Sequence, residues 1–498
     1  MFEFNRALPE EAGIPSKAIM SLLDYLDKKE IPMHSLLIMR NNKLIFEKYY
    51  APYSAKTLHR MFSISKTVTA LAISALISEG KVTLDGSITD YFPEYVTDST
   101  HQWIKETTIR NMLQMRTCHA STTYKVDMKS DWVESFFIVP PTHKPGTVFH
   151  YDTSAAHVLC ALAEKITQKP MLDYLKEKVL NYMDFSADSY MVKDPFGISM
   201  GGSGLVATPM DFMKILFLIE SKGTITCNDG VTRTLLSKEF LDMATSNISD
   251  TIMTAPIPSE SQGYGMQIWQ NEKGGYVLYG MGGQLGISIP DKNLLIITTA
   301  DTQGIQGGNQ VIYDGIYRFL LPSCDTSSLP TCESEYKQLC DYAETLAIAP
   351  PRMPEGRVNV HANSCSKSSV SPCSFTDETD AVYTLQPNPQ GFEKLHLHIC
   401  QDAVSHISFI KDAKEIKLNF GLNHMEEGIF PIYDNRYTAG AIFLRDNVLY
   451  IRFHLIGECV GSVRFELYFG DNDITVFMRK IEETYFKEFD GHLYGIRV

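Results

Sequence analysis

The stretch Met61-Phe-Ser-Ile-Ser-Lys-Thr-Val-Thr-Ala-Leu-Ala-Ile-Ser-Ala-Leu-Ile-Ser-Glu-Gly80 decides how the rest of the chain is interpreted. Its apolar residues recur at close to 3.6-residue spacing, on enough sides to indicate a helix buried over most of its surface. Ser63 stands at the predicted start, where serine is a favoured capping residue, and Gly80 follows the last periodic position. The stretch therefore predicts one buried helix.

Ser63 and Lys66 lie three residues apart, so both project from the same face of the first turn. A hydroxyl beside an amine, at the positive end of a helix, pairs a nucleophile with a base. A capping serine with a surface lysine is the simpler interpretation, of about equal weight on the local pattern. The same Ser-x-x-Lys spacing recurs at Ser78, Ser334, Ser364 and Ser408. Only Ser63 follows a strand-like segment and opens an apolar helix.

Composition narrows the classes of function. A chain of 498 residues, 44% hydrophobic and 21% charged, is typical of a globular protein with about two to four domains. Its net charge of −14 argues against nucleic acid or an anionic membrane surface as the main partner. The first eleven residues have no apolar signal core, and no run approaches the ~18 apolar residues of a membrane span. We expect a cytoplasmic protein.

The ten cysteines are spread through the chain, which favours free thiols in a reducing compartment. Cys365 and Cys373 share a Ser-rich loop and could pair, although free thiols are the preferred interpretation. The sequence has no Cys-x-x-Cys and no His-Glu-x-x-His, so we expect neither a metal nor another cofactor.

The segments before and after the buried helix have clear patterns. Residues 14–30 predict a helix, and residues 35–50 predict a hairpin around Asn41-Asn42, a favoured two-residue turn. Strands are scarce from 81 to 150. His119 and Tyr124 lie there in a loop, where such residues are more often structural than catalytic.

Tyr151 lies between a Pro-Gly turn and a helix predicted to begin near Thr153 or Ser154. A side chain at such a junction can face a cleft, although a buried tyrosine with a satisfied hydroxyl is the more common case. The Gly-rich turn at 201–204 precedes another helix at 209–221. It could cradle a phosphate, but no Walker lysine follows, and close backbone packing is preferred.

Residues 263–300 are rich in strands, predicted at 263–269, 276–279, 286–289 and 294–300. The glycines of 280–284 either let the backbone approach a ligand closely or form a tight turn. Beyond about residue 322 the composition shifts to Pro, Ser, Thr and Cys. From 391 onward short strands and turns alternate, which indicates an antiparallel sheet or barrel.

In this order the segments resemble the serine β-lactamase-like superfamily, in the branch of class C β-lactamases, DD-peptidases, esterases and 6-aminohexanoate-dimer hydrolases. Its first motif, Ser-x-x-Lys, matches Ser63 and Lys66, and its second, Tyr-x-Asn, matches Tyr151. Its third, Lys-Thr-Gly or His/Tyr-x-Gly, falls at Met281-Gly282-Gly283. The resemblance covers residues ~8–320, and the C-terminal part is similar to the lipocalin-like domain of some members.

Two positions depart from the family pattern. Thr153 replaces the Asn of the second motif, and Met281 replaces the cation of the third. The resemblance assigns Thr153, Met281 and Gly282 to substrate binding. Methionine has no charge and is only a weak acceptor, so it cannot hold a substrate carboxylate. The departures weaken a β-lactamase assignment more than a general hydrolase assignment.

The resemblance implies acyl transfer on an ester or amide. Ser63 Oγ would attack the carbonyl, with Lys66 and Tyr151 as general base and acid in an order that stays open. The backbone N–H groups of Ser63 and of Gln284, or of Gly283, would form the oxyanion hole. Water would then release the product.

We therefore predict an α+β protein. A β-lactamase/transpeptidase-like domain, with an antiparallel sheet flanked by helices and an all-helical region, spans 1–325. A connecting segment follows at 326–385 and an antiparallel β domain at 386–498. The predicted function is a serine hydrolase of small esters or amides. The alternatives are a DD-peptidase or β-lactamase acting on peptidoglycan-like substrates, and a non-catalytic member that binds a ligand or assembles into a homo-oligomer.

Overall fold

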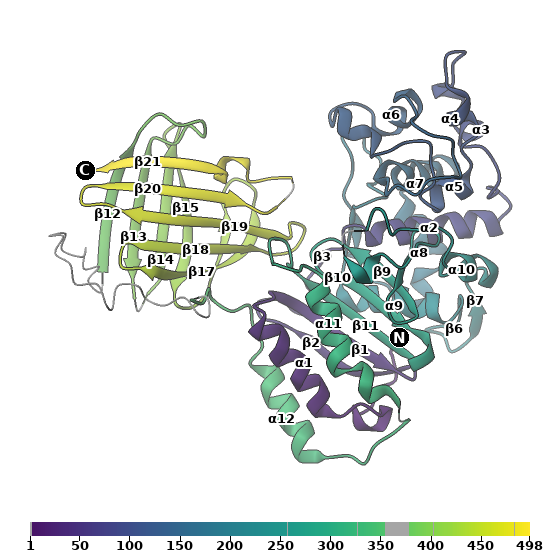
Figure 1. The fold of residues 1–498 in the computed structure, drawn as a ribbon, viewed down its shortest axis with the longest axis horizontal. Helices are drawn as coiled ribbons and strands as arrows, with labels where there is room; N and C mark the ends of the chain where they lie inside the picture. The colour runs from purple at the N-terminus through teal and green to yellow at the C-terminus, as the bar shows by residue number, and fades with distance from the viewer. Residues whose placement is uncertain (1, 256, 326, 354–377, 402, 483) are drawn as a thin grey trace. The chain divides into compact units, whose positions relative to one another are not determined.

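The computed structural model describes residues 2–255, 257–325, 327–353, 378–401, 403–482 and 484–498. The chain forms two compact units, Met1–Leu346 and Ala347–Val498. The first combines a sheet with helices and the second is an antiparallel barrel, which confirms the predicted α+β class (Figure 1). The eight cysteines in the described ranges are free thiols. Cys365, Cys373 and Ser364 lie outside those ranges.

The main sheet of the first unit has six antiparallel strands in the order β2-β1-β11-β10-β9-β8. They are β1 (Met33–Arg40), β2 (Lys43–Tyr49), β8 (Trp269–Asn271), β9 (Gly275–Gly280), β10 (Gln284–Ile289) and β11 (Leu294–Ala300). Asn41 and Asn42 have φ values of 50° and 59°, as the two-residue turn of the predicted hairpin requires. β1 pairs with β11 along its length. An early and a late segment of the first unit are therefore neighbours in the middle of the sheet.

The strand predicted at 263–269 is wrong in its extent, because β8 begins only at Trp269. The preceding residues make their hydrogen bonds elsewhere. Gly265 N donates to Ile268 O at 2.8 Å, and Gln267 N donates to Leu113 O at 3.0 Å. Gln267 is also left-handed, with φ 62°, which a strand cannot accommodate.

Helices cover the sheet. Helices α1 (Ser16–Lys28), α11 (Gln310–Phe319) and α12 (Glu333–Glu344) pack together (Figure 1). Helix α9 (Pro209–Glu220) contacts β1, β10 and β11. Every residue of these three strands is buried, so both of their faces are covered by other elements.

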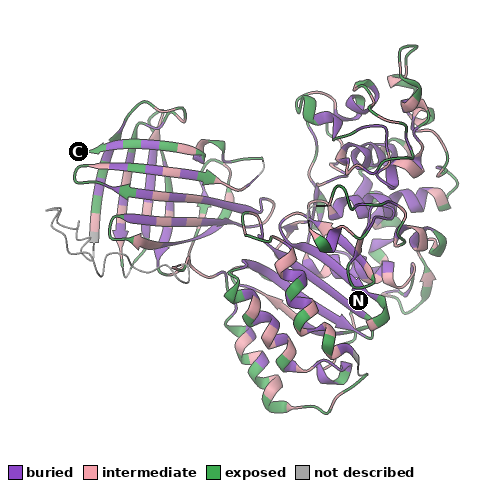
Figure 2. Ribbon diagram, viewed as in Figure 1, coloured by how far each residue is buried: buried purple, intermediate pink, exposed green. Residues whose placement is uncertain are grey.

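The helical region is built around α2 (Ile64–Ser78), which contacts α7 (Thr153–Thr167) and α8 (Met171–Lys178). Thirteen of the fifteen α2 residues are buried (Figure 2), which agrees with the predicted buried helix. The other helices here are α3 (Ile88–Tyr91), α4 (Gln102–Lys105), α5 (Ile109–Leu113), α6 (Trp132–Ile138) and α10 (Lys238–Ala244). Short strands complete the unit: β3 (His59–Arg60), β4 (Tyr190–Met191), β5 (Leu205–Ala207), β6 (Thr224–Thr226) and β7 (Thr232–Thr234).

The second unit is a closed nine-stranded barrel with one additional strand, β16, on its side. Its strands are β12 (Glu378–Leu385), β13 (Lys394–Cys400), β14 (Ser405–Lys411), β15 (Lys414–Leu422), β16 (Glu426–Phe430), β17 (Asn435–Arg445), β18 (Val448–Leu455), β19 (Gly461–Phe469), β20 (Asp473–Lys480) and β21 (Gly491–Arg497). A short parallel pairing of β15 with β17 closes it, through Gly421 with Gly440 and Leu422 with Ala441. Phenylalanine side chains such as Phe409, Phe453 and Phe465 fill the interior.

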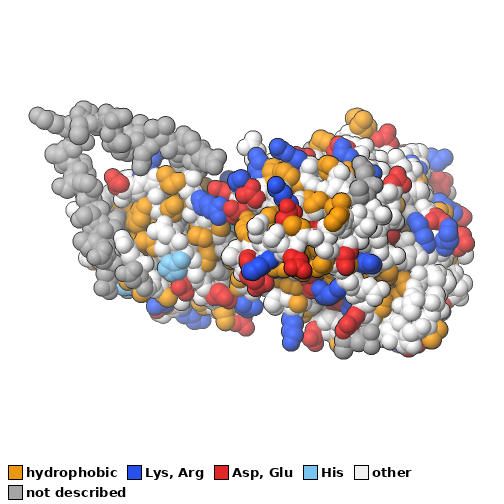
Figure 3. Space-filling view, turned by 90° about the horizontal axis from the view of Figure 1, so that it is seen from below, with side chains coloured by type: hydrophobic (Ala, Val, Ile, Leu, Met, Phe, Trp, Pro, Cys, Tyr) orange, Lys and Arg blue, Asp and Glu red, His pale blue; other side chains and the backbone are white. Residues whose placement is uncertain are grey.

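The segment predicted as a connection, 326–385, contains α12 and β12. β12 belongs to the barrel because it pairs with β13 and β21. The barrel therefore begins before residue 386, where the β domain was predicted to start. On the face drawn in Figure 3, acidic, basic and hydrophobic side chains are interspersed. Among the described helices, none is long and apolar enough to cross a membrane.

Candidate active site

The N-terminus of α2 brings Ser63 and Lys66 together. Phe62 is left-handed, with φ 46°, and turns the chain sharply from β3 into the helix. Ser63 occupies the N-cap position, but its side chain caps no backbone N–H. Instead, Lys66 Nζ donates to Ser63 Oγ at 2.9 Å. The hydroxyl is therefore held by an amine rather than used as the helix cap that the simpler interpretation requires.

Lys66 is fully enclosed, with 1% of its surface exposed. Its Nζ also donates to Gly202 O at 2.8 Å and lies 4.6 Å from the centroid of the Tyr151 ring. A buried ammonium is tolerated only with such polar and aromatic partners. The amine is thus fixed between a hydroxyl, a carbonyl and an aromatic ring.

Two glycines allow the backbone of the 201–204 turn to lie close to α7 and to Lys66. A Cβ on Gly202 would lie 2.3 Å from Thr153 Cγ2, and one on Gly201 would lie 2.2 Å from Cys160 Cβ. Either distance is far inside van der Waals contact. The Gly-rich turn therefore packs its backbone tightly against α7, as preferred above, and this packing presents the Gly202 carbonyl to Lys66.

Tyr151, just before the start of α7, approaches the Ser63–Lys66 pair from another part of the chain. Asp152 caps that helix by accepting from Ser154 N at 2.9 Å, and Thr153 N donates to Thr122 Oγ1 at 3.0 Å. Burial raises the pKa of Tyr151 well above its ordinary value, and hydrogen bonds with the Ser63 and Trp269 side chains act in the opposite direction. The phenol form therefore prevails at neutral pH.

Aromatic rings line the side of Tyr151. Trp269 lies 5.3 Å from it between ring centroids. Tyr264 packs edge-on against Trp269 at 5.0 Å, and Tyr279 lies 6.1 Å from Trp269. These distances are typical of attractive aromatic pairs, so the Tyr151 ring is held by packing as well as by hydrogen bonds.

The turn Met281-Gly282-Gly283 joins β9 to β10 beside the start of α2. A Cβ on Gly280 would lie 2.4 Å from Met61 O, so the end of β9 abuts the segment that leads to Ser63. The buried Gln284 side chain donates to Met281 O at 2.7 Å and to Ala300 O at 3.0 Å, which fixes the turn. The oxyanion-hole role of Gln284 or Gly283, and the substrate contacts of Thr153, Met281 and Gly282, stay predictions.

The other Ser-x-x-Lys segments of the described ranges lack these surroundings. Ser78 ends α2 and donates to Ser74 O at 3.0 Å, and Ser334 lies on α12. Ser408 is on strand β14, where residues three apart point to opposite faces.

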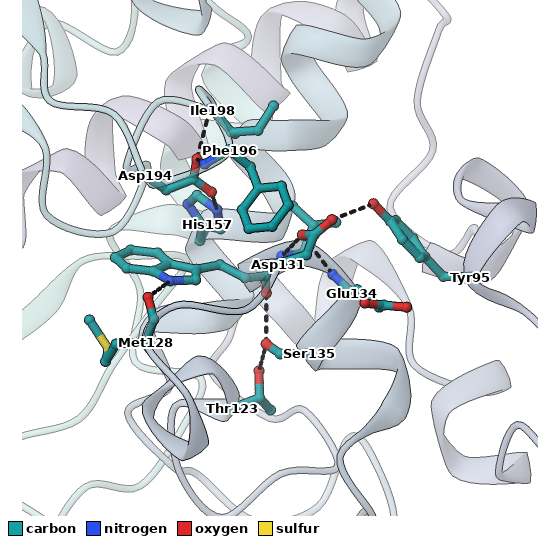
Figure 4. A network of polar contacts seen from close by, with 12 residues as sticks. Tyr95, Thr123, Met128, Asp131, Glu134, Ser135, His157, Asp194, Phe196 and Ile198 are labelled. Carbon is teal, nitrogen blue, oxygen red and sulfur yellow. Dashed lines mark hydrogen bonds and ion pairs between the residues drawn. The ribbon is translucent and has the colours of Figure 1, made fainter.

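A network of polar contacts supports the start of α7 (Figure 4). The buried His157 Nε2 lies 3.0 Å from Asp194 Oδ2. Burial alone would raise the pKa of Asp194, but hydrogen bonds from His157 and the Ile198 backbone lower it below its ordinary value. Thr123 N donates to Ser154 Oγ at 3.1 Å. These bonds tie the neighbouring loops to the helix that follows Tyr151.

Sequence reasoning missed Glu260, which lies in a short 3-10 helix, Pro258–Glu260. Its side chain is 2% exposed. Burial raises the pKa of Glu260 to about 7, although a hydrogen bond with Asn309 lowers it. Its negative charge in turn raises the pKa of Tyr151. No motif surrounds Glu260, so only the three-dimensional structure reveals it.

Glu260→Gln is expected to make stability less dependent on pH. The folded protein keeps the Glu260 proton up to about pH 7, whereas the unfolded chain releases it near the ordinary pKa of 4.5. The wild-type free energy of unfolding should therefore fall, relative to that of the variant, as pH rises through this window, and level off above it. The difference should reach about 3 kcal/mol. Urea unfolding of both proteins at pH 5 and pH 8 measures it, and parallel curves would contradict the burial assigned to Glu260.

Comparisons with known proteins identify the family and the fold. The beta-lactamase family model matches residues 21–311. A 6-aminohexanoate-dimer hydrolase of Paenarthrobacter ureafaciens is 21% identical over 297 residues, 56% of this chain and 75% of that protein. Protein flp of Staphylococcus aureus is 26% identical over 209 residues, 38% of this chain and 42% of its own length. The solved structure from Bacillus anthracis described as a "putative 6-aminohexanoate-dimer hydrolase" superposes with a TM-score of 0.52 at 19% identity, covering 66% of this chain and 89% of its own. That likeness shows the fold.

Proposed function

The chain belongs to the beta-lactamase family, and on that premise we propose that it is a serine hydrolase of small esters or amides that forms an acyl-enzyme on Ser63. Family membership and the amide-hydrolase relative support a hydrolase in general. The observation that carries the serine mechanism is the contact of three side chains distant in sequence. Lys66 Nζ lies 2.9 Å from Ser63 Oγ and 4.6 Å from the centroid of the Tyr151 ring, and the Ser63 side chain lowers the pKa of Tyr151.

In the proposed acylation, Ser63 Oγ attacks the substrate carbonyl carbon and gives its proton to the Lys66 amine, which has to lose its own proton before it can act as the base. The raised pKa of Tyr151 suits it to act as an acid, because a phenol can donate its proton to the leaving alcohol or amine. Lys66 then gives up the proton that it took from Ser63, and Tyr151 is reprotonated. The carbonyl–leaving-group bond breaks, and the acyl group stays on Ser63.

The developing oxyanion needs two donors. The first N–H groups of a helix have no partner inside the helix, which supports the backbone N–H of Ser63 as one of them. The second would come from Gln284 or Gly283, which lie at the β9–β10 turn beside α2. One such donor typically contributes about 10²–10³ in rate.

The favoured substrate class follows from the identity of residue 281, in the β9–β10 turn. By the resemblance to the family motif, Met281 replaces the cation that would hold a substrate carboxylate, so we favour neutral esters and amides. The second candidate, a DD-peptidase or β-lactamase activity on peptidoglycan-like substrates, depends on that missing cation. A protein that binds a ligand without catalysis is the third. The enclosed Lys66, held against Ser63, favours the first over the third, because a buried charge without a function is costly.

A fluorophosphonate probe tests the proposal directly. We expect stoichiometric labelling, located on Ser63 by peptide mass spectrometry. A panel of p-nitrophenyl acetate and butyrate, nitrocefin and a D-amino-acid amide then identifies the substrate class. Absence of labelling would favour the ligand-binding alternative, and preferential turnover of nitrocefin would favour the β-lactamase alternative.

A further inference from the structure

We propose that Thr298, on strand β11, is a positioning residue that directs the backbone N–H of Gln284 toward the substrate oxyanion. This role rests on the proposed serine hydrolase function, and it names the group that orients the second donor of the oxyanion hole. No motif marks Thr298, which lies in a strand whose residues are all buried.

The hydroxyl of Thr298 holds the peptide group between Gly283 and Gln284. Thr298 Oγ1 donates to Gly283 O at 2.8 Å, and the residue is completely enclosed, with 0% of its surface exposed. A trans peptide group is planar, with its C=O and its N–H on opposite sides. The bond that fixes the Gly283 carbonyl on Thr298 therefore fixes the N–H of Gln284 in the opposite direction, away from β11.

The direction away from β11 leads to the nucleophile. β10 lies between β11 and β9 in the main sheet. A Cβ on Gly280, at the end of β9, would lie 2.4 Å from Met61 O, two residues before Ser63. An N–H that points to this side can bond to the oxyanion that forms when Ser63 Oγ attacks a carbonyl.

The rest of the β9–β10 turn is held in place by its own hydrogen bonds. Gln284 Nε2 donates to Met281 O at 2.7 Å and to Ala300 O at 3.0 Å, and Ala300 N donates to Gln284 Oε1 at 3.0 Å. Thr302 N donates to Gly282 O at 2.9 Å. The turn is thus tied to β11 and to the residues just after it. The Thr298 hydroxyl belongs to a side chain outside the turn, so a substitution can remove this donor without changing the turn's own sequence.

Thr298→Val tests the role, because valine keeps the shape of threonine and removes the hydroxyl donor. The Gly283 carbonyl would no longer be held, and the N–H of Gln284 would lose its direction with it. We expect kcat for a p-nitrophenyl ester to fall about tenfold, part of the 10²–10³ that a complete oxyanion donor contributes. KM should stay unchanged, because a bond to the oxyanion acts in the transition state and not in the bound substrate. Thr298→Ser keeps the hydroxyl and should recover most of the rate.

Thr107→Val is the matched control. Thr107 is also buried, and its hydroxyl also donates to a backbone carbonyl, Trp103 O at 2.8 Å, in the helical region. The control should lower the urea midpoint comparably and keep the wild-type kcat. If Thr298→Val does not fold, Thr298→Ala and Thr298→Ser are compared instead, because both lose the methyl group and they differ only in the hydroxyl.

Three outcomes would refute the role of Thr298: a wild-type kcat in Thr298→Val, a loss that Thr298→Ser does not recover, or equal kcat values in the alanine and serine variants. Fluorophosphonate labelling of Ser63 in the wild type would then still support the serine hydrolase. If the wild type is not labelled, the proposed function itself fails.

Discussion

Ser63→Ala is expected to lower kcat/KM for a p-nitrophenyl ester by at least about 10⁴-fold, because no other group can form the acyl-enzyme bond. The fold should survive. The Ser63 side chain caps no backbone group of α2, so its removal should cost less than the ~1 kcal/mol typical of a lost cap. Initial rates, together with thermal unfolding followed by circular dichroism, measure both quantities.

Ser78→Ala is the matched control for this variant. Ser78 lies at the other end of the same helix, belongs to a second Ser-x-x-Lys segment, and donates its hydroxyl proton to Ser74 O within the helix. We expect the wild-type rate from it. Hydrolysis by Ser63→Ala at the wild-type rate would remove Ser63 from the chemistry and leave the contact with Lys66 as a structural one.

Lys66→Met should have the second largest effect, a loss of about 10³–10⁴ in kcat/KM, since the proton of Ser63 would have no nearby acceptor of suitable basicity. Its effect on stability should be small. A buried charge that is replaced by an apolar side chain of similar length is often neutral or favourable, and the lost hydrogen bond to Gly202 O costs about 1 kcal/mol. Enzyme assays and urea unfolding measure the two effects separately.

Loss of activity without loss of stability would separate a functional lysine from a structural one. Lys81→Met, at the lysine of the Ser78 segment, serves as the control and should match the wild type in rate. If Lys66→Met unfolds the protein, the buried ammonium is chiefly a structural element of the helix packing. If it retains the wild-type rate, the proton must pass to another group.

Local pattern predicted the elements whose hydrogen bonds are local. The buried helix α2 and the hairpin of β1 and β2 were recognisable because their periodicity and turn residues lie within a short stretch. The loop before β8 was not, because Gln267 takes its partners from α5 and α2, more than a hundred residues away. β12 was assigned to the connecting segment, although it pairs with the next strand, β13, and with the distant β21.

The residues of the candidate site divide in the same way, into those with a local sequence signature and those placed by distant parts of the chain. Ser63, Lys66 and Tyr151 could be predicted as candidate site residues because their motifs combine a residue type with a local position. Trp269 and Glu260 have no such signature, because their effects on Tyr151 depend on placement by distant parts of the chain. The Gly202 carbonyl is a backbone atom, and its bond to Lys66 can be read only from the structure.

The pairing of β1 with β11 has a consequence for biosynthesis. Met33 leaves the ribosome early, yet its partner Ala300 is made only after the whole helical region. At about 5–20 residues per second, the edge of the first hairpin waits on the order of ten seconds or more for its neighbour. During that interval a nascent chain exposes an unpaired strand, which other chains or chaperones can bind. Ser63 likewise stays without the β9–β10 turn until Gln284 has been made.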